Sequence, residues 1–221
     1  MFKIFKVATL FTLLLISLNL SAQDKPPFWD DIQTIKAYDK IYAAPENPIL
    51  FIGSSSIRLW VDFTKTFRDY TVLNRGVGGE VTSDTDRYLE DLVFPYRPKQ
   101  VVIYVGENDV FKAKDGEEIF ESFKKLYAHL RTGMPEVPVI YIALKGSPSR
   151  KEHLPKVIKA NSLIQEFIQK EKNIVFLDIF HPMLDSKGNM QPELFKTDML
   201  HMNASGYKIW NKILLPHLLK D

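Results

Sequence analysis

Four short segments of this chain carry residues whose types could perform acyl chemistry. In chain order they are "GSSS" (53–56), "NRGVGGE" (74–80), "GEND" (106–109) and "TDMLHMN" (197–203). Hydrolysis of an ester through a serine needs a nucleophile, a base, a group that orients the base, and hydrogen-bond donors for the oxyanion. The four segments contain a residue type for each of these roles.

The nucleophile and its base would come from the first and last segments. Ser54, Ser55 and Ser56 stand in a row after an apolar run, so any of them could attack, or one could simply cap the following helix. His201 is the candidate base. Asp198 lies three residues before it, close enough for its carboxylate to reach the imidazole Nδ1 and fix the tautomer.

The oxyanion donors would come from the two middle segments. A backbone N–H at Gly79 could approach a substrate closely because glycine has no Cβ. Asn108, in "GEND", offers a side-chain amide as a further donor beside the N–H of the nucleophile. Each segment alone also fits a turn or a capped helix, so the prediction depends on their combination.

The elements that must position these segments follow from the apolar pattern. Short, continuously apolar runs rich in β-branched residues predict strands that are buried on both faces. They are residues 48–53, 71–76, 100–106, 137–145 and 173–180. Three of the four chemical segments stand at or directly after a predicted strand end, and the fourth follows the last strand by about twenty residues.

Helix-period segments separate and follow these strands. They are expected at residues 115–133, with Asp115 as N-cap, at 153–171 and at 204–219, and a further helix before the first strand should pack against the sheet. The alternation predicts an α/β fold with three layers, a flavodoxin-like, doubly wound, five-stranded parallel sheet. Such folds bind ligands at the carboxyl ends of the strands.

The first 22 residues have the pattern of a secretory signal. Lys3 and Lys6 precede an apolar run of about a dozen residues, which is short for a membrane span of about 20. Small residues at Ser21 and Ala22 predict cleavage before Gln23. The expected organisation is therefore a signal peptide at 1–22 and a single domain at 23–221, exported to the periplasm or secreted, with no stable membrane anchor.

The charge balance argues against an electrostatic partner. Of 29 Lys and Arg residues against 27 Asp and Glu, only Lys3 and Lys6 lie in the leader, so the mature chain would carry no net side-chain charge. Nothing in this balance favours nucleic acid or an anionic membrane. The chain contains no cysteine, so core packing alone must stabilise an exported domain of this length.

The four segments resemble the sequence blocks of the SGNH hydrolases, also called GDSL esterases/lipases, which carry Ser, Gly, Asn and His. Here the blocks are "FIGSSSI", "NRGVGGE", "GEND" and "DMLH", and they run from Phe51 to His201. Their order and spacing are similar to the platelet-activating-factor acetylhydrolase-like branch. The resemblance implies a serine esterase for small acyl esters, such as acetyl groups on polysaccharide, that needs no metal or cofactor.

The resemblance also selects one serine. The family pattern is Gly-Asp-Ser-Leu/Ile, and Gly53 takes its first position, which makes Ser55 the nucleophile. Ser54 departs from the family's aspartate, which is not the acid of the triad. The site that the resemblance implies consists of the catalytic residues Ser55, Asp198 and His201 and the oxyanion-hole residues Ser55, Gly79 and Asn108.

Two other kinds of hydrolase fit the sequence less well. An α/β-hydrolase would carry Gly-x-Ser-x-Gly at its nucleophile, whereas residue 57 is Ile. A metal hydrolase would need a ligand set, and the acidic candidates with His201 match no known metal spacing. These candidates are Asp84, Asp86, Asp109 and Asp198, and His129, His153, His181 and His217 have no evident partners.

A carbohydrate-binding module without activity is the alternative from a different class. Trp29 and Trp60 could stack on sugars, or they could pack in the core or at its edge. Arg58, Lys145 and Arg150 fall near predicted strand ends or in adjoining loops, where they could touch a polar leaving group or remain solvated surface charges. A complete Ser-His-Asp set favours the enzyme, because binding alone does not require one.

Overall fold

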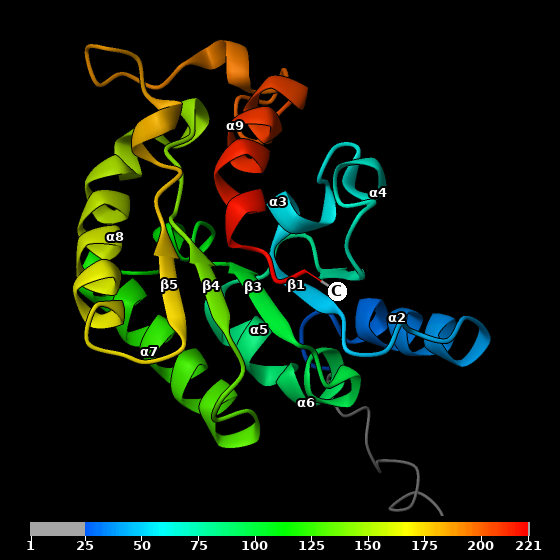
Figure 1. Ribbon diagram of the computed structural model, residues 1–221. Coiled ribbons are helices and arrows are strands. Elements are labelled where there is room, and N and C mark those ends of the chain that lie inside the picture. The colour runs from blue at the N-terminus through cyan, green and yellow to red at the C-terminus, as the bar shows by residue number, and fades with distance from the viewer. Residues whose placement is uncertain (1–24, 221) are drawn as a thin grey trace, which may run out of the picture.

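The computed structural model describes residues 25–220, and the expected signal peptide lies outside them. At its centre is a parallel sheet with the strand order β2-β1-β3-β4-β5 (Figure 1). The strands are β1 (Ile49–Gly53), β2 (Val72–Gly76), β3 (Gln100–Tyr104), β4 (Val139–Ile142) and β5 (Ile174–Leu177). The predicted doubly wound sheet is confirmed. Each strand is shorter than predicted. In β4, for example, Ala143 and Leu144 are buried and apolar but lie beyond the last residue pair of the strand, so the apolar run is longer than the strand itself.

Helices connect the strands and cover the sheet. The α-helices are α2 (Trp29–Ile41), α3 (Ser55–Arg58), α4 (Phe63–Thr66), α5 (Thr82–Arg87), α6 (Leu89–Leu92), α7 (Gly116–Gly133), α8 (Leu154–Ile168) and α9 (Ala204–Leu214). Short 3-10 turns lie at Phe94–Tyr96, Asp109–Phe111, Pro148–His153, His181–Met183, Pro192–Leu194 and Leu215–His217. Among these described residues, no helix is both long and apolar enough to cross a membrane.

One layer is formed by α9 together with α3, α4 and the segment between them. Phe51 of β1 packs edge-on against Trp60, which in turn packs against Trp210 of α9 at 5.4 Å between ring centroids. Tyr104 of β3 contacts the same Trp210 at 4.7 Å. These large side chains are buried, so Trp60 belongs to the core and is no sugar platform. Each such burial stabilises the fold by about 1.5–3 kcal/mol.

The opposite layer contains α5 to α8, seen on the far side of the sheet from α9 in Figure 1. The predicted cap of α7 is present, because the Asp115 side chain accepts the N–H of Glu118 at 3.1 Å. The apolar stripe of α7 is buried, and Phe123 packs against Tyr141 of β4 at 4.7 Å. The pattern of α7 was therefore predicted correctly from its period of 3.6 residues.

The first and last helices differ from expectation. The last helix ends at Leu214 rather than near residue 219, because Pro216 has no N–H to continue the helical bonds and a 3-10 turn follows. The first helix, α2, lies at the side of the sheet in Figure 1, and Ile32 is its one fully buried residue. The expectation that this helix packs against the sheet therefore holds only at the edge of the sheet. Its contacts are with the edge strand β2 and with α6.

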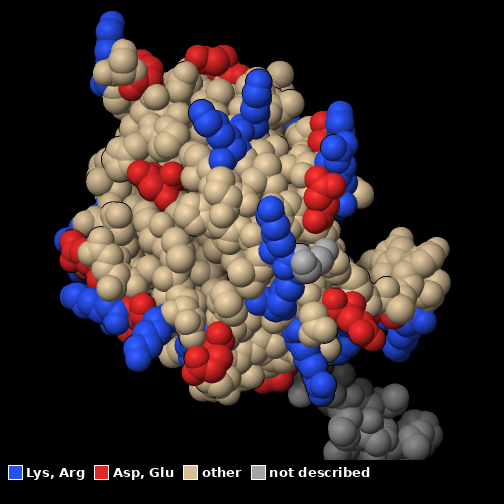
Figure 2. Space-filling model, in the orientation of Figure 1, with Lys and Arg blue, Asp and Glu red and all other residues tan. Residues whose placement is uncertain are grey.

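Charged side chains are mixed on the face shown in Figure 2, where Lys and Arg alternate with Asp and Glu. This distribution accords with the balanced composition of the sequence. No large field of one sign is visible on that face.

Candidate active site

The end of β1 places Ser55 at the start of a helix. Gly53 adopts φ +120°, and a Cβ there would lie 2.0 Å from the carbonyl oxygen of Tyr104, so the turn requires glycine. Ser54 is the N-cap of α3, and its Oγ accepts the N–H of Ser55 at 2.6 Å. Ser55 is therefore the first residue of α3, where backbone N–H groups have no intrahelical partner.

His201 connects this serine to a carboxylate. Its Nε2 lies 3.0 Å from Oγ of Ser55, and its Nδ1 lies 2.7 Å from Oδ2 of Asp198. The other carboxylate oxygen accepts the N–H groups of Leu200 and His201, each at 2.9 Å. The hydrogen bond from the His201 side chain, with these backbone bonds, lowers the pKa of Asp198. The ionised carboxylate orients the imidazole so that Nε2 faces the serine hydroxyl.

Gly79 and Asn108 flank the serine. Gly79 adopts φ +92° and lines the same hollow as Ser55. The side-chain amide of Asn108 donates to Oγ of Ser54 and to the carbonyl of Glu80, both at 2.8 Å. Both amide hydrogens of Asn108 are thus already bonded, and an oxyanion would have to displace the Ser54 hydroxyl. An oxyanion is the stronger acceptor, because hydrogen bonds to ionised groups are about twice as strong as neutral ones.

Arg150 holds Asn108 from the other side. Its guanidinium donates to Oδ1 of Asn108 at 2.8 Å and to the backbone carbonyl of Glu107 at 2.9 Å. The side chain is largely buried and rests over the ring of Phe111. Arg150 therefore orients the amide of Asn108, a role that its position in a loop did not reveal.

A buried ion pair supports this corner of the site. Nζ of Lys145 lies 2.6 Å from both carboxylate oxygens of Glu107, and Oγ of Ser147 joins them. Burial tends to raise the pKa of Glu107, but the charges of Lys145 and Arg150 outweigh it and lower that pKa. Burial lowers the pKa of Lys145 in spite of its partner. Removing either charge would leave the other unpaired, at a cost of about 3–5 kcal/mol.

Lys145 is buried and does not line the hollow at Ser55, so it is neither a surface charge nor a substrate contact. Both interpretations of Lys145 from the sequence were wrong. It is the last residue of the predicted strand "VPVIYIALK" (137–145), whose other residues are apolar, and a lysine at the end of such a buried run requires a counter-charge. That requirement was the available signal for pairing Lys145 with Glu107. The acid stands in the middle of the "GEND" segment, beside Asn108.

A second acidic side chain, Glu80, is buried next to the site without full compensation. Its Oε2 accepts the hydroxyl of Thr85 at 2.7 Å, and its Oε1 has no hydrogen-bond partner among residues 25–220. Burial raises the pKa of Glu80 to about 8, with a further contribution from the Asp84 charge. Burial at this position therefore favours the protonated form of the Glu80 carboxyl group.

A hollow of about 400 Å³ opens over the serine and the imidazole. Two arginines and two leucines join the candidate catalytic groups in its wall. The lining residues are Ser55, Arg58, Leu59, Gly78, Gly79, Asn108, Arg150, Leu200 and His201. All five residues predicted for the site line this hollow or, in the case of Asp198, bond directly to a residue that does.

Other side chains considered in the sequence lie elsewhere. His129 pairs with Asp86 at 2.8 Å, and His181 pairs with Asp178 at 2.7 Å, so the expectation that these histidines lack partners was wrong. Asp109 accepts the backbone N–H of Thr82. Within residues 25–220, no three His, Cys, Asp or Glu side chains form a group that could hold a metal ion.

The arrangement of hydroxyl, imidazole and carboxylate at the carboxyl edge of a parallel sheet is that of a serine hydrolase. Comparison of the sequence with protein families agrees. Residues 53–209 match the model described as the GDSL-like lipase/acylhydrolase family, and the chain belongs to this family of serine ester hydrolases. No curated protein matches the chain.

Solved structures with the same fold include three from different bacteria. A protein from Streptococcus pneumonia, provisionally described as a platelet activating factor, is 22% identical with a TM-score of 0.75, over 96% of this chain and 99% of that one. A GDSL-like lipase from Bacteroides thetaiotaomicron is 22% identical with a TM-score of 0.70, over 84% and 96%. A catalytic mutant of an acetylxylan esterase from Geobacillus stearothermophilus is 14% identical with a TM-score of 0.61, over 80% and 96%. The predicted resemblance is confirmed.

Proposed function

We propose that this chain is an exported esterase that hydrolyses small acyl esters, acetyl esters above all, with Ser55 as nucleophile. The observation that carries the proposal is the continuous set of contacts from Asp198 through His201 to Ser55, which ends in an open hollow. The leucines and arginines of the hollow suit a short acyl group beside a polar alcohol. An acetylxylan esterase among the structures of this fold accords with that substrate class.

The proposed reaction has two stages. His201 takes the proton of the Ser55 hydroxyl at Nε2 while Oγ attacks the ester carbonyl carbon, and the oxyanion accepts N–H groups of Ser55, Gly79 and Asn108. The intermediate collapses to an acyl-enzyme, and His201 returns the proton to the departing alcohol. Water then attacks the acyl group with His201 as base, which releases the acid and restores the serine.

The experiment that tests this proposal is labelling of the protein from residue 23 onward with a fluorophosphonate. An activated serine displaces fluoride and forms a bond to phosphorus, and peptide mass spectrometry locates the tag. We expect the tag on Ser55, together with hydrolysis of p-nitrophenyl acetate, and we expect both to be lost in His201→Ala. Ser162→Ala, which removes an exposed helical serine, is the matched control and should change neither result.

Other outcomes would contradict the proposal in different ways. A tag on Ser54 or Ser56 would leave the esterase proposal in place but assign the nucleophile to another serine. No tag and no acetate release, under conditions that label a known serine esterase, would favour the alternative of a carbohydrate-binding module. Export is tested separately by sequencing the amino terminus of secreted or periplasmic protein, where Gln23 is the expected first residue.

A further inference from the structure

The helix α2 is fixed to the body of the protein along one face. Ile32 is fully buried, and the Asp39 carboxylate binds the guanidinium of Arg75 in the edge strand β2. A second ion pair joins Lys36 to Asp91 at 2.5 Å. These contacts fix the orientation of α2, so the neighbouring face of the helix is presented in a preformed position.

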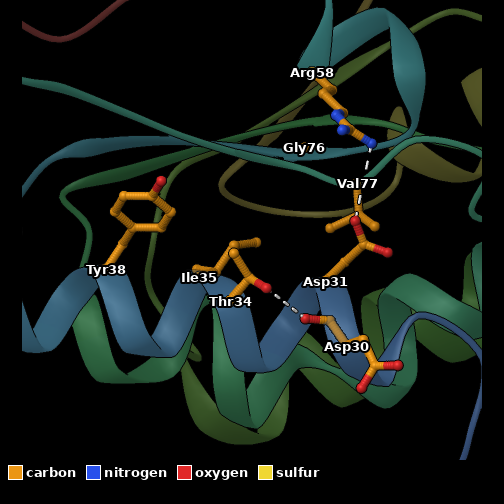
Figure 3. A pocket seen from close by; sticks show the side chains of 8 residues that line it. All are labelled: Asp30, Asp31, Thr34, Ile35, Tyr38, Arg58, Gly76 and Val77. Atoms are coloured by element: carbon orange, nitrogen blue, oxygen red, sulfur yellow. Dashed lines mark hydrogen bonds and ion pairs between the residues drawn. The ribbon is translucent and has the colours of Figure 1, made fainter.

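That neighbouring face borders a hollow of about 370 Å³ between α2 and the end of β2, a volume within the range of ligand sites. Figure 3 shows Asp31 and Tyr38 rising from α2 toward it, with Arg58 descending from the other side. Most of the α2 residues in its wall are spaced three or four apart, as one helix face requires. The principal lining side chains are Asp30, Asp31, Thr34, Ile35, Tyr38 and Arg58.

Arg58 joins this hollow to the candidate active site, because it lines both. A Cβ added to Gly78 would lie 3.2 Å from Nη1 of Arg58 and 3.9 Å from Cβ of Ser55, so the guanidinium lies over the backbone beside the serine. The start of α2 also touches the site. The ring of Phe28 would lie 3.6 Å from a Cβ at Gly79.

The charges of the α2 hollow define the ligand that would fit. Asp31 and Arg58 face each other in the hollow at 3.9 Å, and Asp30 pairs with Lys25 at 2.8 Å, so an ion of either sign would meet a like charge. A neutral ligand whose groups both donate and accept hydrogen bonds would satisfy the carboxylates and the guanidinium together, and hydroxyl groups do so. The half-exposed ring of Tyr38 adds a flat apolar face.

We propose that the α2 hollow binds the alcohol half of the ester, and that this alcohol is a neutral polyol such as a sugar unit. The inference rests on the proposed esterase function, and it assigns the leaving-group side of the substrate to α2. This helix precedes the segment that matches the family, residues 53–209. The reactive carbonyl would lie at Ser55 while the hydroxyls of the alcohol bind beyond Arg58.

The test compares two acetyl esters on the protein from residue 23 onward. One is p-nitrophenyl acetate, whose alcohol has no further hydroxyl, and the other is methyl 6-O-acetyl-glucoside. We expect Asp31→Ala and Tyr38→Ala each to lower kcat/KM for the sugar ester, relative to p-nitrophenyl acetate, by about tenfold. Tyr38→Phe keeps the ring and should keep most of the preference. Lys40→Ala, an exposed change on α2 outside the lining, is the matched control.

The outcomes separate this inference from the esterase proposal. An unchanged ratio in both variants, with hydrolysis of both esters by the unaltered protein, would overturn the α2 subsite and leave the esterase in place. A dependence of acetylcholine hydrolysis on Asp31, in place of the sugar ester, would overturn the neutral polyol. Absence of any ester hydrolysis and of labelling at Ser55 would overturn the esterase proposal and this inference together.

Discussion

Two regions of this molecule carry the same Asp-x-x-His arrangement, and they differ in what the imidazole meets. In both, the aspartate holds Nδ1 of the histidine at 2.7 Å and also accepts that histidine's backbone N–H. At Asp198 and His201 the free ring nitrogen lies 3.0 Å from Oγ of Ser55. At Asp178 and His181 the imidazole is largely exposed, with 77% of its side-chain surface accessible.

The surroundings of His181 even include the other residue types of an active site. A hollow of about 220 Å³ beside it is lined by Ser162 and Asn161 among others. Ser162, however, lies inside α8, where its N–H belongs to the helix, and its hydroxyl donates to Glu166 at 3.3 Å. The amide of Asn161 is bound at both ends to the backbone of Leu144, at 2.8 Å each.

The comparison shows that a histidine oriented by an aspartate is not sufficient for catalysis, because a serine must also be placed next to it. Ser55 starts a helix directly after a strand, so its N–H has no intrahelical partner and is bonded to the Ser54 hydroxyl, which an oxyanion would displace, whereas the N–H of Ser162 lies inside a helix. The adjacent ends of β1 and β3 bring Ser55 and Asn108 together, whereas Ser162 and Asn161 both lie within the single helix α8. Asp-x-x-His fixes a tautomer, and the position of the serine decides whether chemistry can follow.

The largest expected difference between the regions is at the histidines. His201→Ala should lower kcat/KM for p-nitrophenyl acetate by about 10⁴-fold or more, because the base is removed. His181→Ala, the matched control with the same local motif, should stay within about twofold. Steady-state kinetics of the two variants provide the measurement. Equal losses in both would show that the two regions are not functionally distinct.

The aspartates should differ next. Asp198→Asn should lower kcat by about 10³–10⁴-fold, because the amide no longer stabilises the imidazolium and disturbs the tautomer. Asp178→Asn should leave kcat unchanged. Both variants should retain the far-ultraviolet circular dichroism of the unaltered protein. A small loss in Asp198→Asn, below about fivefold, would show that His201 is oriented without its carboxylate.

The asparagines should separate activity from stability. Asn108→Ala should lower kcat by about 10²–10³-fold, as the loss of one oxyanion donor does. Asn161→Ala should lower the free energy of unfolding by about 2 kcal/mol or more, because it leaves the buried N–H and carbonyl of Leu144 unpaired. Urea unfolding and kinetics on both variants test this contrast. Reduced activity per folded molecule in Asn161→Ala would contradict it.

The smallest expected difference is in the acid range of the pH profile. Activity should fall as pH decreases, since a histidine base acts only as the neutral imidazole. Hydrogen bonds lower the pKa of Asp198, so this carboxylate stays ionised while the activity is lost. His181→Ala should leave the midpoint of this loss unchanged. A shift of the midpoint in that variant would show that the exposed histidine contributes to the profile.

The sequence was sufficient to predict the sheet, and the five residues predicted for the site lie together in the structure. Buried parallel strands are continuously apolar, so their number and order of appearance were readable, and strand ends attract chemistry in this class of fold. The three adjacent serines could not be distinguished from residue types alone. Only the family pattern selected Ser55, which the structure places 3.0 Å from His201.

Polar contacts between residues far apart in the chain could not be predicted from the sequence. Lys145 and Glu107 pair across neighbouring strands, and nothing in a linear pattern states which acid meets a buried lysine. Arg150 lies 42 residues after Asn108, in a loop whose path depends on the whole fold. The pairing of His181 with Asp178 was local and could have been read from its spacing, as it was for Asp198 and His201.

The position of α2 in the chain has a consequence for how such an enzyme diversifies. The candidate catalytic groups all lie between residues 53 and 209, whereas the α2 residues that line the hollow come before them. Mutations at Asp31, Thr34 or Tyr38 alter exposed side chains and leave the buried core intact. A library of variants at these three positions would therefore change substrate preference with little loss of folding stability. Natural mutations at the same positions would have the same effect.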